Sequence, residues 1–163
     1  MLAALIDAGP LTALLNPNDE WHTWARDTMR RLPVPLLTSE PVLTETSHLL
    51  RREGCDADEL FALAENGVVR IGLRFEDERA ALRELMARYR DVPMSLADAT
   101  LVRLAELNAE SRIFTLNSDF RIYRRHRNKI IPVLMPHDDQ APGSRLAESP
   151  IPYRVRRKPA KGS

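Results

Sequence analysis

The chain of 163 residues contains one cysteine, six glycines and no apolar run long enough to cross a bilayer. The single cysteine, Cys55, excludes an internal disulfide framework and a cysteine-rich zinc site. No G-x-G-x-x-G pattern follows the first apolar run, which argues against a dinucleotide-binding site. The first residues, MLAALID, lack the basic and long apolar regions of a secretory signal, so we expect a cytoplasmic protein with no membrane segment.

Charge is nearly balanced over the chain but unevenly distributed along it. The sequence has 24 Lys and Arg against 23 Asp and Glu, a formal net charge of +1. Residues 149–163 contain five of the basic residues and no acid, and a second basic cluster, RIYRRHRNK, spans residues 121–129. The body of the chain is therefore slightly acidic with local basic patches, unlike a uniformly basic nucleic-acid coat protein.

The pattern of apolar runs and helix signals predicts strands that alternate with helices. Buried strands are expected at 2–7, 34–39, 68–73, 112–116 and 130–134. Helices are expected at 9–16, 20–32, 40–54, 56–66, 76–90 and 96–110, with a short helical turn at 118–126. This alternation indicates an α/β fold with a five-stranded parallel sheet covered by helices on both faces.

The composition of the chain changes after Met135. We expect residues 1–135 to form one domain, which is long enough for a single substantial core. Residues 136–163 are rich in proline and poor in large apolar side chains, and are expected to form a basic, disordered tail.

Four acidic residues stand where predicted strands end or predicted helices begin. Asp7 ends the first strand, and Glu45 lies about a turn and a half into the helix after the second. Asp98 lies in the first turn of the helix at 96–110, and Asp119 follows the strand at 112–116. Because ligands of open α/β sheets gather at the carboxyl ends of the strands, we expect these acids to converge on one edge.

Carboxylates in one cleft raise each other's pKa unless a cation compensates their charge. Ligation by oxygen alone suits Mg²⁺ or Mn²⁺ and suits zinc poorly. Such an ion lowers the pKa of a bound water and neutralises charge on a phosphodiester. The four acids together therefore predict metal-assisted phosphodiester hydrolysis.

Each acid also has a purely structural interpretation. Asp98 is three residues after Ser95, an S-x-x-D arrangement close to a capping box. Asp7 could be a turn residue, and Asp119 could cap the turn that follows it. Glu45 is the hardest to explain this way, because it shares a helix side with apolar residues. The four acids taken together favour a metal site more strongly than any one of them does alone.

Four ordered segments resemble the PIN-domain family and are especially similar to the VapC-type toxins of bacterial toxin–antitoxin pairs. They are LIDAGPLTALLN, LTSEPVLTETSHLL, VPMSLADATLVRLAE and IFTLNSDFRIYRR, within residues 1–135. The resemblance implies a Mg²⁺- or Mn²⁺-dependent endoribonuclease with a parallel sheet flanked by helices. It also implies an RNA substrate, a cognate antitoxin protein as partner and a homodimer.

The resemblance further assigns roles, since Asp7, Glu45 and Asp98 match the family's three most regular acids. It implies that Asp7 and Asp98 hold the catalytic metal, while Glu45 ligates it through water or orients the attacking water. At the fourth position this chain has T-L-N-S-D-F, so Asn117 stands where the family often has an acid. Either Asp119 supplies a fourth carboxylate, or Asn117 assists a site with three acids.

Two further groups of residues follow from the same segment. Thr115 would hydrogen-bond a ligating carboxylate and so orient it. Arg121, Arg124 and Arg125 lie just past the fourth acidic position and would position RNA by contacting its phosphates. A solvated helix face is an equally good interpretation of these arginines.

Three other functions compete with a toxin nuclease. An RNA-processing PIN nuclease without an antitoxin has the same sequence features, and a degenerate PIN domain that only binds is supported by Asn117 alone. A phosphoacceptor regulatory domain would need an acidic pair after the first strand and a lysine that ends the last strand. LIDAG holds one acid and Lys129 precedes the last strand, so this alternative fits poorly.

Overall fold

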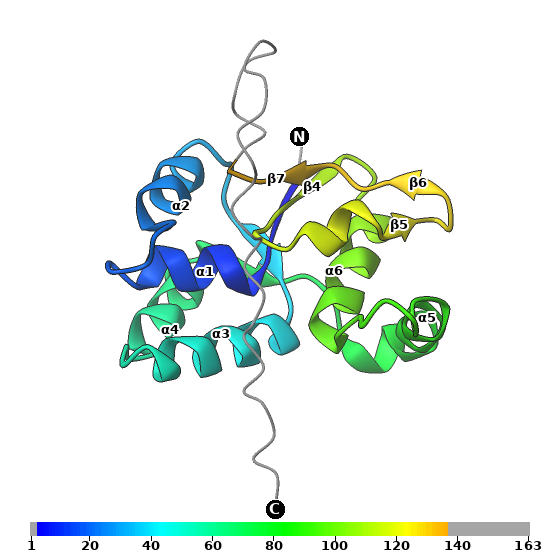
Figure 1. Ribbon diagram of the computed structural model, residues 1–163, viewed down its shortest axis with the longest axis horizontal. Helices are drawn as coiled ribbons and strands as arrows, with labels where there is room; N and C mark the ends of the chain where they lie inside the picture. Colours follow the sequence, from blue (N-terminus) through cyan, green and yellow to red (C-terminus); the bar gives the residue numbers. More distant parts are fainter. Residues whose placement is uncertain (1–2, 137–163) are drawn as a thin grey trace, which may run out of the picture.

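A computed structural model describes residues 3–136 and shows one parallel sheet at the centre of the molecule (Figure 1). The strands of this sheet are β1 (Ala3–Ile6), β2 (Leu36–Thr38), β3 (Val69–Ile71), β4 (Ser111–Phe114) and β7 (Val133–Leu134). Their order is β3-β2-β1-β4-β7, and every pair of neighbours is parallel. The predicted five-stranded parallel sheet is confirmed. The predicted tail lies outside the described residues from His137 onward.

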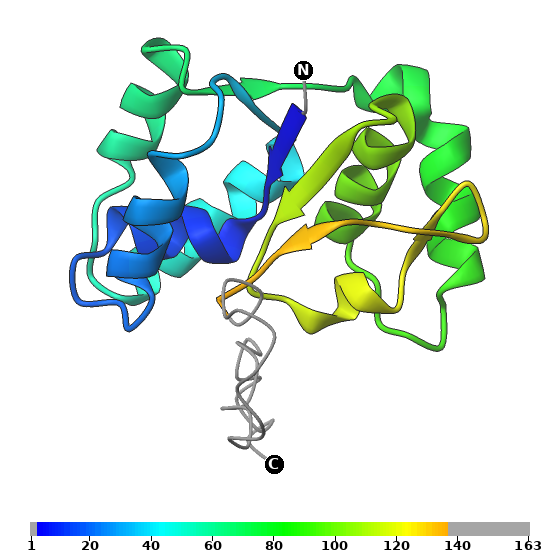
Figure 2. The ribbon, with the colours of Figure 1, turned by 90° about the horizontal axis from the view of Figure 1, so that it is seen from above.

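Helices cover the two faces of the sheet in two groups (Figure 2). One group consists of α1 (Ala8–Leu15), α2 (His22–Met29), α3 (Glu40–Arg52) and α4 (Asp58–Glu65). The other consists of α5 (Phe75–Arg88) and α6 (Leu96–Leu107). Leu5, Ile6 and Ile113 of the central strands are fully buried between them. Burial on both faces explains why the strands are continuous apolar runs rather than alternating ones. None of the helices within residues 3–136 is long and apolar enough to cross a membrane.

The order of the strands places β1 at the middle of the sheet. β1 pairs with β2 on one side and with β4 on the other, and Ile6 lies beside Phe114 in the β1–β4 register. The residues that follow these two strands, Asp7 and Thr115, therefore emerge next to each other at the carboxyl edge.

Side-chain caps start the helices where the sequence predicts them. The Ser39 hydroxyl accepts a hydrogen bond from the Val42 amide, and Pro41 occupies the first turn of α3. Ser95 and Asp98 form a reciprocal capping box at the start of α6. The N-terminal ends of α3 and α6 meet, since the hydroxyls of Ser39 and Thr100 lie 2.6 Å apart in a buried hydrogen bond.

The predicted helical turn at 118–126 is wrong beyond Arg121. The structure has a short 3₁₀ helix, η1 (Ser118–Arg121), followed by an antiparallel hairpin of β5 (Arg124–Arg125) and β6 (Lys129–Ile130). His126 and Arg127 turn this hairpin with positive φ angles of 47° and 71°. A helix cannot continue through two left-handed residues, so the basic cluster is a hairpin.

The hairpin also shortens the last predicted strand. Ile130 belongs to β6, and only Val133–Leu134 of the predicted strand at 130–134 pairs with β4. The carbonyl of Pro132 accepts a hydrogen bond from Ile113, so the chain joins the sheet just after the hairpin.

Candidate active site

Asp7 lies at the carboxyl end of the central strand with both carboxylate oxygens hydrogen-bonded. It caps α1 through Oδ1, which accepts the Ala8 amide at 2.7 Å. Oδ2 accepts the Thr115 hydroxyl at 2.6 Å. The side chain is 6% exposed, so it opens only slightly to solvent. The β1–β4 register fixes this pair, because Asp7 and Thr115 directly follow paired residues.

Asp98 lies in the first turn of α6 and contacts two other segments of the chain. Its Oδ2 accepts the Ser95 amide at 3.2 Å and the Tyr123 hydroxyl at 3.1 Å. In return, the Asp98 amide donates to the Ser95 hydroxyl at 3.0 Å. The structural interpretation of Asp98 as a cap is therefore correct. The capping hydrogen bonds hold the Asp98 carboxylate at the same edge of the sheet as Asp7. A role as helix cap is therefore compatible with a role as metal ligand.

Glu45 reaches the same region from α3. It lies in the second turn of that helix and is half-buried. The hydrogen bond between Ser39 and Thr100 holds the start of α3 against the start of α6, which brings Glu45 toward Asp98.

The charges of these carboxylates affect one another's pKa. Burial raises the pKa of Asp7 to about 7, hydrogen bonds from Thr115 and Ala8 oppose the shift, and the charges of Asp98 and Glu45 add to it. Burial and the nearby Asp98 raise the pKa of Glu45. Burial raises the pKa of Asp98 as well, against the hydrogen bonds that it accepts, and the charge of Asp119 adds to the increase. The structure thus brings the four predicted acids within electrostatic range.

These carboxylates fit a hard cation by their chemistry. All are oxygen donors, and their pKa values are raised by burial and mutual repulsion, both of which a bound cation offsets. Asp7 and Asp98 also lie at helix N-termini, whose partial positive charge favours anions. Within residues 3–136, no three His, Cys, Asp or Glu side chains are close enough to surround one ion.

Asn117 and Asp119 differ in what they offer to the site. The Asn117 side-chain oxygen accepts the Asp119 amide at 3.0 Å and caps η1. The Asn117 amide donates to the Thr115 hydroxyl at 2.9 Å, so Asn117 supports the residue that orients Asp7. Asp119 contributes charge to the cluster, because it raises the pKa of Asp98.

The three predicted RNA-binding arginines lie on η1 and β5, which follow Asp119 in the chain. Arg121 is exposed. The Nη1 group of Arg124 donates to the carbonyls of Arg121, Ile122 and Tyr123 at 2.7–3.0 Å. The Nη1 group of Arg125 donates to the Ala109 carbonyl at 2.8 Å, beyond the end of α6. The last two arginines are therefore half-buried and partly engaged with the backbone.

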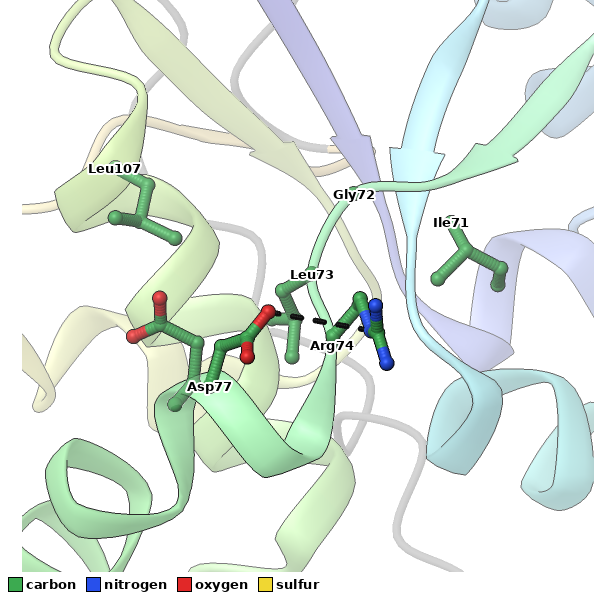
Figure 3. A pocket seen from close by; sticks show the side chains of 7 residues that line it. Ile71, Gly72, Leu73, Arg74, Asp77 and Leu107 are labelled. Atoms are coloured by element: carbon green, nitrogen blue, oxygen red, sulfur yellow. Dashed lines mark ion pairs between the residues drawn. The ribbon is translucent and has the colours of Figure 1, made fainter.

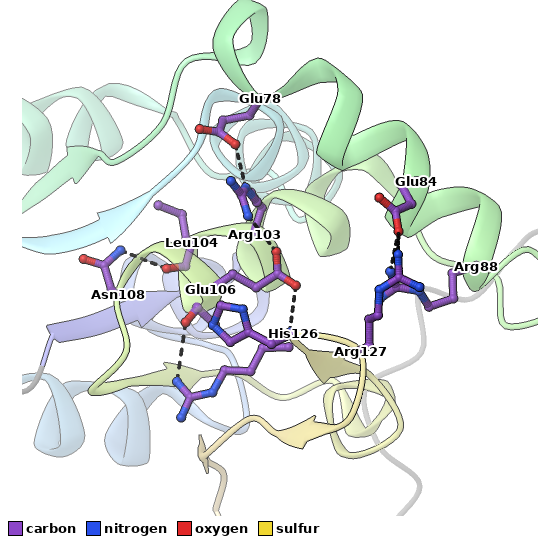
Figure 4. A network of polar contacts seen from close by, with 11 residues as sticks. Glu78, Glu84, Arg88, Arg103, Leu104, Glu106, Asn108, His126 and Arg127 are labelled. Carbon is purple, nitrogen blue, oxygen red and sulfur yellow. Dashed lines mark hydrogen bonds and ion pairs between the residues drawn. The ribbon is translucent and has the colours of Figure 1, made fainter.

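A polar network fixes the hairpin against the helices (Figure 4). Arg103 of α6 pairs with Glu78 of α5 and with Glu106. The second oxygen of Glu106 accepts the His126 amide at 2.9 Å, at the hairpin turn. Arg127 pairs with Glu84 of α5 at 2.7 Å. The basic residues of the hairpin are consequently held in one place relative to the acidic cluster.

Tyr123 contacts the candidate site and was missed by the sequence analysis. It is fully buried, and its hydroxyl donates to Asp98. Its ring packs edge-on against Phe120 and Tyr89, and the Tyr89 hydroxyl accepts the Arg124 amide at 2.8 Å. The available signal was an aromatic residue inside an otherwise basic cluster, four positions after Asp119.

A separate pocket of about 520 Å³ opens beside the edge strand β3 (Figure 3). It is lined by the β3–α5 connection and by Leu107 at the end of α6. Arg74 and Asp77, two of its lining residues, form an exposed ion pair. None of the four predicted acids lines it, so it is not part of the candidate active site.

Comparisons with known proteins agree with this geometry. The PIN domain family model matches residues 4–125. The crystal structure of VapC20 from Mycobacterium tuberculosis, described as a toxin that cleaves the sarcin–ricin loop, superposes with a TM-score of 0.65. The two chains are 25% identical, and the match covers 77% of this chain and 100% of VapC20. No curated protein matches the sequence.

Proposed function

The chain belongs to the PIN domain family, and on that premise we propose that it is a metal-dependent endoribonuclease, the toxin of a type II toxin–antitoxin pair. The observation that carries the proposal is Asp7, a nearly buried carboxylate whose pKa is raised to about 7 beside Asp98 and Glu45. Buried carboxylates with raised pKa values are typical of sites that bind a cation or carry out a reaction. The likeness to VapC20 supports cleavage of RNA rather than of another phosphodiester.

In this proposal Asp7 and Asp98 hold a Mg²⁺ or Mn²⁺ ion, and Asp119 or Asn117 completes its surroundings. The bound ion would lower the pKa of a water molecule and neutralise charge on the scissile phosphate. The protein's own residues position the two ligands. Thr115 and the Ala8 amide fix the two oxygens of Asp7, and Tyr123 and Ser95 fix Asp98.

Glu45 is the residue we assign to the attacking water. Its carboxylate has no hydrogen bond to another of the described residues, and burial and the charge of Asp98 raise its pKa. A carboxylate with a raised pKa is a stronger proton acceptor than an ordinary one. Glu45 would therefore orient the water and accept its proton as the phosphodiester is attacked.

The basic hairpin supports the choice of RNA as substrate. Arg121, Arg124 and Arg125 follow Asp119 on η1 and β5, and in this proposal they contact phosphates of the RNA. We expect a looped or single-stranded RNA, because its bases can be splayed out and its 2′-hydroxyls contacted. We further propose a cognate antitoxin as partner, a homodimeric state and a cytoplasmic location.

The first experiment is a cleavage assay on purified protein free of any partner. A sarcin–ricin stem-loop and an unstructured RNA are incubated with Mg²⁺, Mn²⁺ or EDTA. The Asp98→Asn variant is compared with Asp77→Asn, a matched change at an exposed acid of α5. We expect cleavage that needs metal, is retained by Asp77→Asn and falls at least about 100-fold in Asp98→Asn.

Different results separate the alternatives. Cleavage by the wild type without growth arrest on expression would favour an RNA-processing nuclease over a toxin. Folded protein that binds RNA but neither cuts it nor binds Mn²⁺ would favour a degenerate binding module.

A further inference from the structure

Gly9 lies in the first turn of α1, two residues after Asp7. Glycine favours a helix less than any residue except proline, so alanine at this position would suit the helix better. The backbone does not require glycine here either, since the glycines with positive φ angles in residues 3–136 are Gly54 and Gly67, at 74° and 70°. The reason for a glycine at this position must therefore be the space that its missing side chain leaves.

The space beside Gly9 is filled by Leu116, which belongs to the segment that follows β4. A Cβ atom added at Gly9 would lie 3.2 Å from the Cβ of Leu116, 3.4 Å from its Cδ1 and 3.5 Å from its Cγ. Carbon atoms in favourable contact are about 3.5–4.0 Å apart. Leu116 is buried and has little room to move away. The first turn of α1 therefore approaches this segment more closely than a residue with a side chain would allow.

Leu116 is the middle residue of a turn, residues 115–117, that orients the hydroxyl of Thr115. The Asn117 amide donates to this hydroxyl at 2.9 Å and so occupies one acceptor position of its oxygen. The hydroxyl itself donates to Oδ2 of Asp7 at 2.6 Å. The Thr115 amide donates to the Leu134 carbonyl at 3.1 Å, which ties the start of the turn to β7. The turn thus supplies Asp7 with one oriented donor.

The contact between Gly9 and Leu116 joins the same two segments as the hydrogen bond between Asp7 and Thr115. Asp7 caps α1 through the Ala8 amide, so its carboxylate moves with the first turn of that helix. Thr115 is covalently bonded to Leu116 and moves with the turn. Because the O–H···O distance is already short, a separation of the segments by a few tenths of an ångström would weaken this hydrogen bond.

We propose that Gly9 is a positioning residue, whose missing side chain lets the turn at Leu116 come close enough for Thr115 to orient the Asp7 carboxylate for metal binding. The proposal rests on the proposed function, in which Asp7 is a metal ligand. Gly9 acts through Leu116 and Thr115, and it contacts neither the metal nor the RNA. Residues that orient a metal ligand typically change metal affinity by roughly 10- to 100-fold.

A flexible helix start is the other explanation for Gly9, and the local structure argues against it. The residue that follows is Pro10, whose ring fixes its own φ angle. The Leu11 amide donates to the Asp7 carbonyl at 3.3 Å and closes the first turn. The two explanations also differ in one consequence, because only the positioning role makes the effect of a side chain at Gly9 depend on Leu116.

The test is the variant Gly9→Ala, with Mn²⁺ binding measured by isothermal titration calorimetry. We expect the dissociation constant for Mn²⁺ to rise roughly tenfold. The melting temperature without metal should change by less than about 4 °C, because better helix propensity offsets the crowding. Cleavage should fall most at limiting Mn²⁺ and recover in part when Mn²⁺ is raised.

The variant Leu116→Ala shows whether the effect passes through the contact. It removes Cγ and Cδ1, two of the three atoms that a Cβ at Gly9 would meet. Gly9→Ala should therefore weaken Mn²⁺ binding less than about threefold when it is introduced into Leu116→Ala, compared with roughly tenfold in the wild type. A loss of equal size in the two backgrounds would overturn the proposal.

Gly72→Ala is the matched control for crowding as such. A Cβ at Gly72 would lie 2.7 Å from Cδ2 of Leu104 and 3.2 Å from the Cβ of Leu37, a closer approach than at Gly9. Gly72 follows β3, which is two strands from β1. We expect Gly72→Ala to lower the melting temperature but to keep Mn²⁺ affinity within about twofold of wild type. Wild-type affinity in Gly9→Ala, or an equal loss of affinity in Gly72→Ala, would overturn the proposal.

Failure of the proposed function is distinguished by a measurement without metal. If the wild type binds no Mn²⁺ and cuts no RNA, hydrogen exchange of the Asn117 amide still reports on the turn that holds Thr115. Faster exchange in Gly9→Ala than in the wild type and in Gly72→Ala would then support the positioning of Thr115 by Gly9 while the nuclease function fails. Equal exchange in the three proteins would overturn the positioning role as well.

Discussion

Asp98 performs two tasks with one carboxylate. It caps the helix that carries it, and the same oxygen receives the hydroxyl of Tyr123 from a segment 25 residues away. Capping fixes the side chain without neutralising its charge, since a carboxylate that accepts hydrogen bonds remains an anion. Asp98 is therefore both the residue that caps α6 and a residue of the candidate active site.

The pKa of Asp7 predicts how stability depends on pH without metal. The folded-state pKa of about 7 lies above the ordinary value of 3.8, so the folded protein binds a proton that the unfolded chain has released. The stabilisation is complete below pH 4 and is lost as the pH rises through 7, by roughly 4 kcal/mol over this interval. In EDTA, the wild type should lose more stability between pH 5 and 8 than Asp7→Asn does.

Chemical denaturation at each pH measures this difference. Adding Mg²⁺ at pH 8 should restore wild-type stability and leave Asp7→Asn nearly unchanged, because a cation replaces the proton. Equal pH profiles for the two proteins would show that Asp7 titrates normally.

Tyr123 predicts a positioning effect on Asp98. Tyr123→Phe removes the hydroxyl that donates to Asp98 and keeps the ring in its aromatic cluster. We expect Mn²⁺ affinity and cleavage to fall about tenfold, the lower end for a residue that supports a metal ligand. Tyr89→Phe is the matched control, since its hydroxyl contacts only the Arg124 amide among these groups. Mn²⁺ titration followed by cleavage assays would distinguish the two variants.

At the scale of elements, the start of α3 determines where Glu45 lies. Ser39 caps this helix and also bonds to Thr100 of α6, so one hydroxyl connects both helices. Ser39→Ala should cost about 1–3 kcal/mol, because a cap and a buried partner are lost together. Thr44→Ala, on the exposed face of α3, should cost less than about 0.5 kcal/mol. Urea denaturation of both variants tests this expectation.

The hairpin shows why one element was assigned wrongly from sequence. RIYRRHRNK has no glycine, asparagine-glycine or aspartate-glycine signal at its turn, so a helical turn was the natural prediction. Its conformation depends on the contact of Glu106 with the His126 amide and on the pair of Arg127 with Glu84. Those partners are 20 and 43 residues distant in the chain, beyond any local pattern.

At the scale of the whole molecule, helix N-termini and strand ends meet on one edge of the sheet. This arrangement follows from the parallel order of the strands, and it concentrates four acids where helix dipoles partly compensate them. The 3₁₀ helix η1, which carries Asp119 and Arg121, follows β4 at this edge.

Truncation after Pro136 tests the predicted domain boundary. The last strand ends at Leu134, and Met135 is buried, so removal of residues 137–163 should leave the melting temperature within about 2 °C of the full chain. The basic residues of this segment should add weak, salt-dependent RNA affinity that the truncated chain lacks. Thermal melts and RNA binding at two salt concentrations provide the comparison. A large drop in melting temperature would move the boundary beyond 136.

The sequence by itself determined the parallel sheet, the caps at Ser39 and Ser95 and the candidate acids, because apolar runs, helix caps and strand-end acids are local patterns. It left open whether Asp98 was a cap or a ligand, since both interpretations predict the same residue at the same place. Only the tertiary structure decided that Tyr123 contacts Asp98, that the basic cluster is a hairpin, and that Gly9 packs against Leu116. Each of these depends on contacts between segments distant in the chain, which no local pattern encodes.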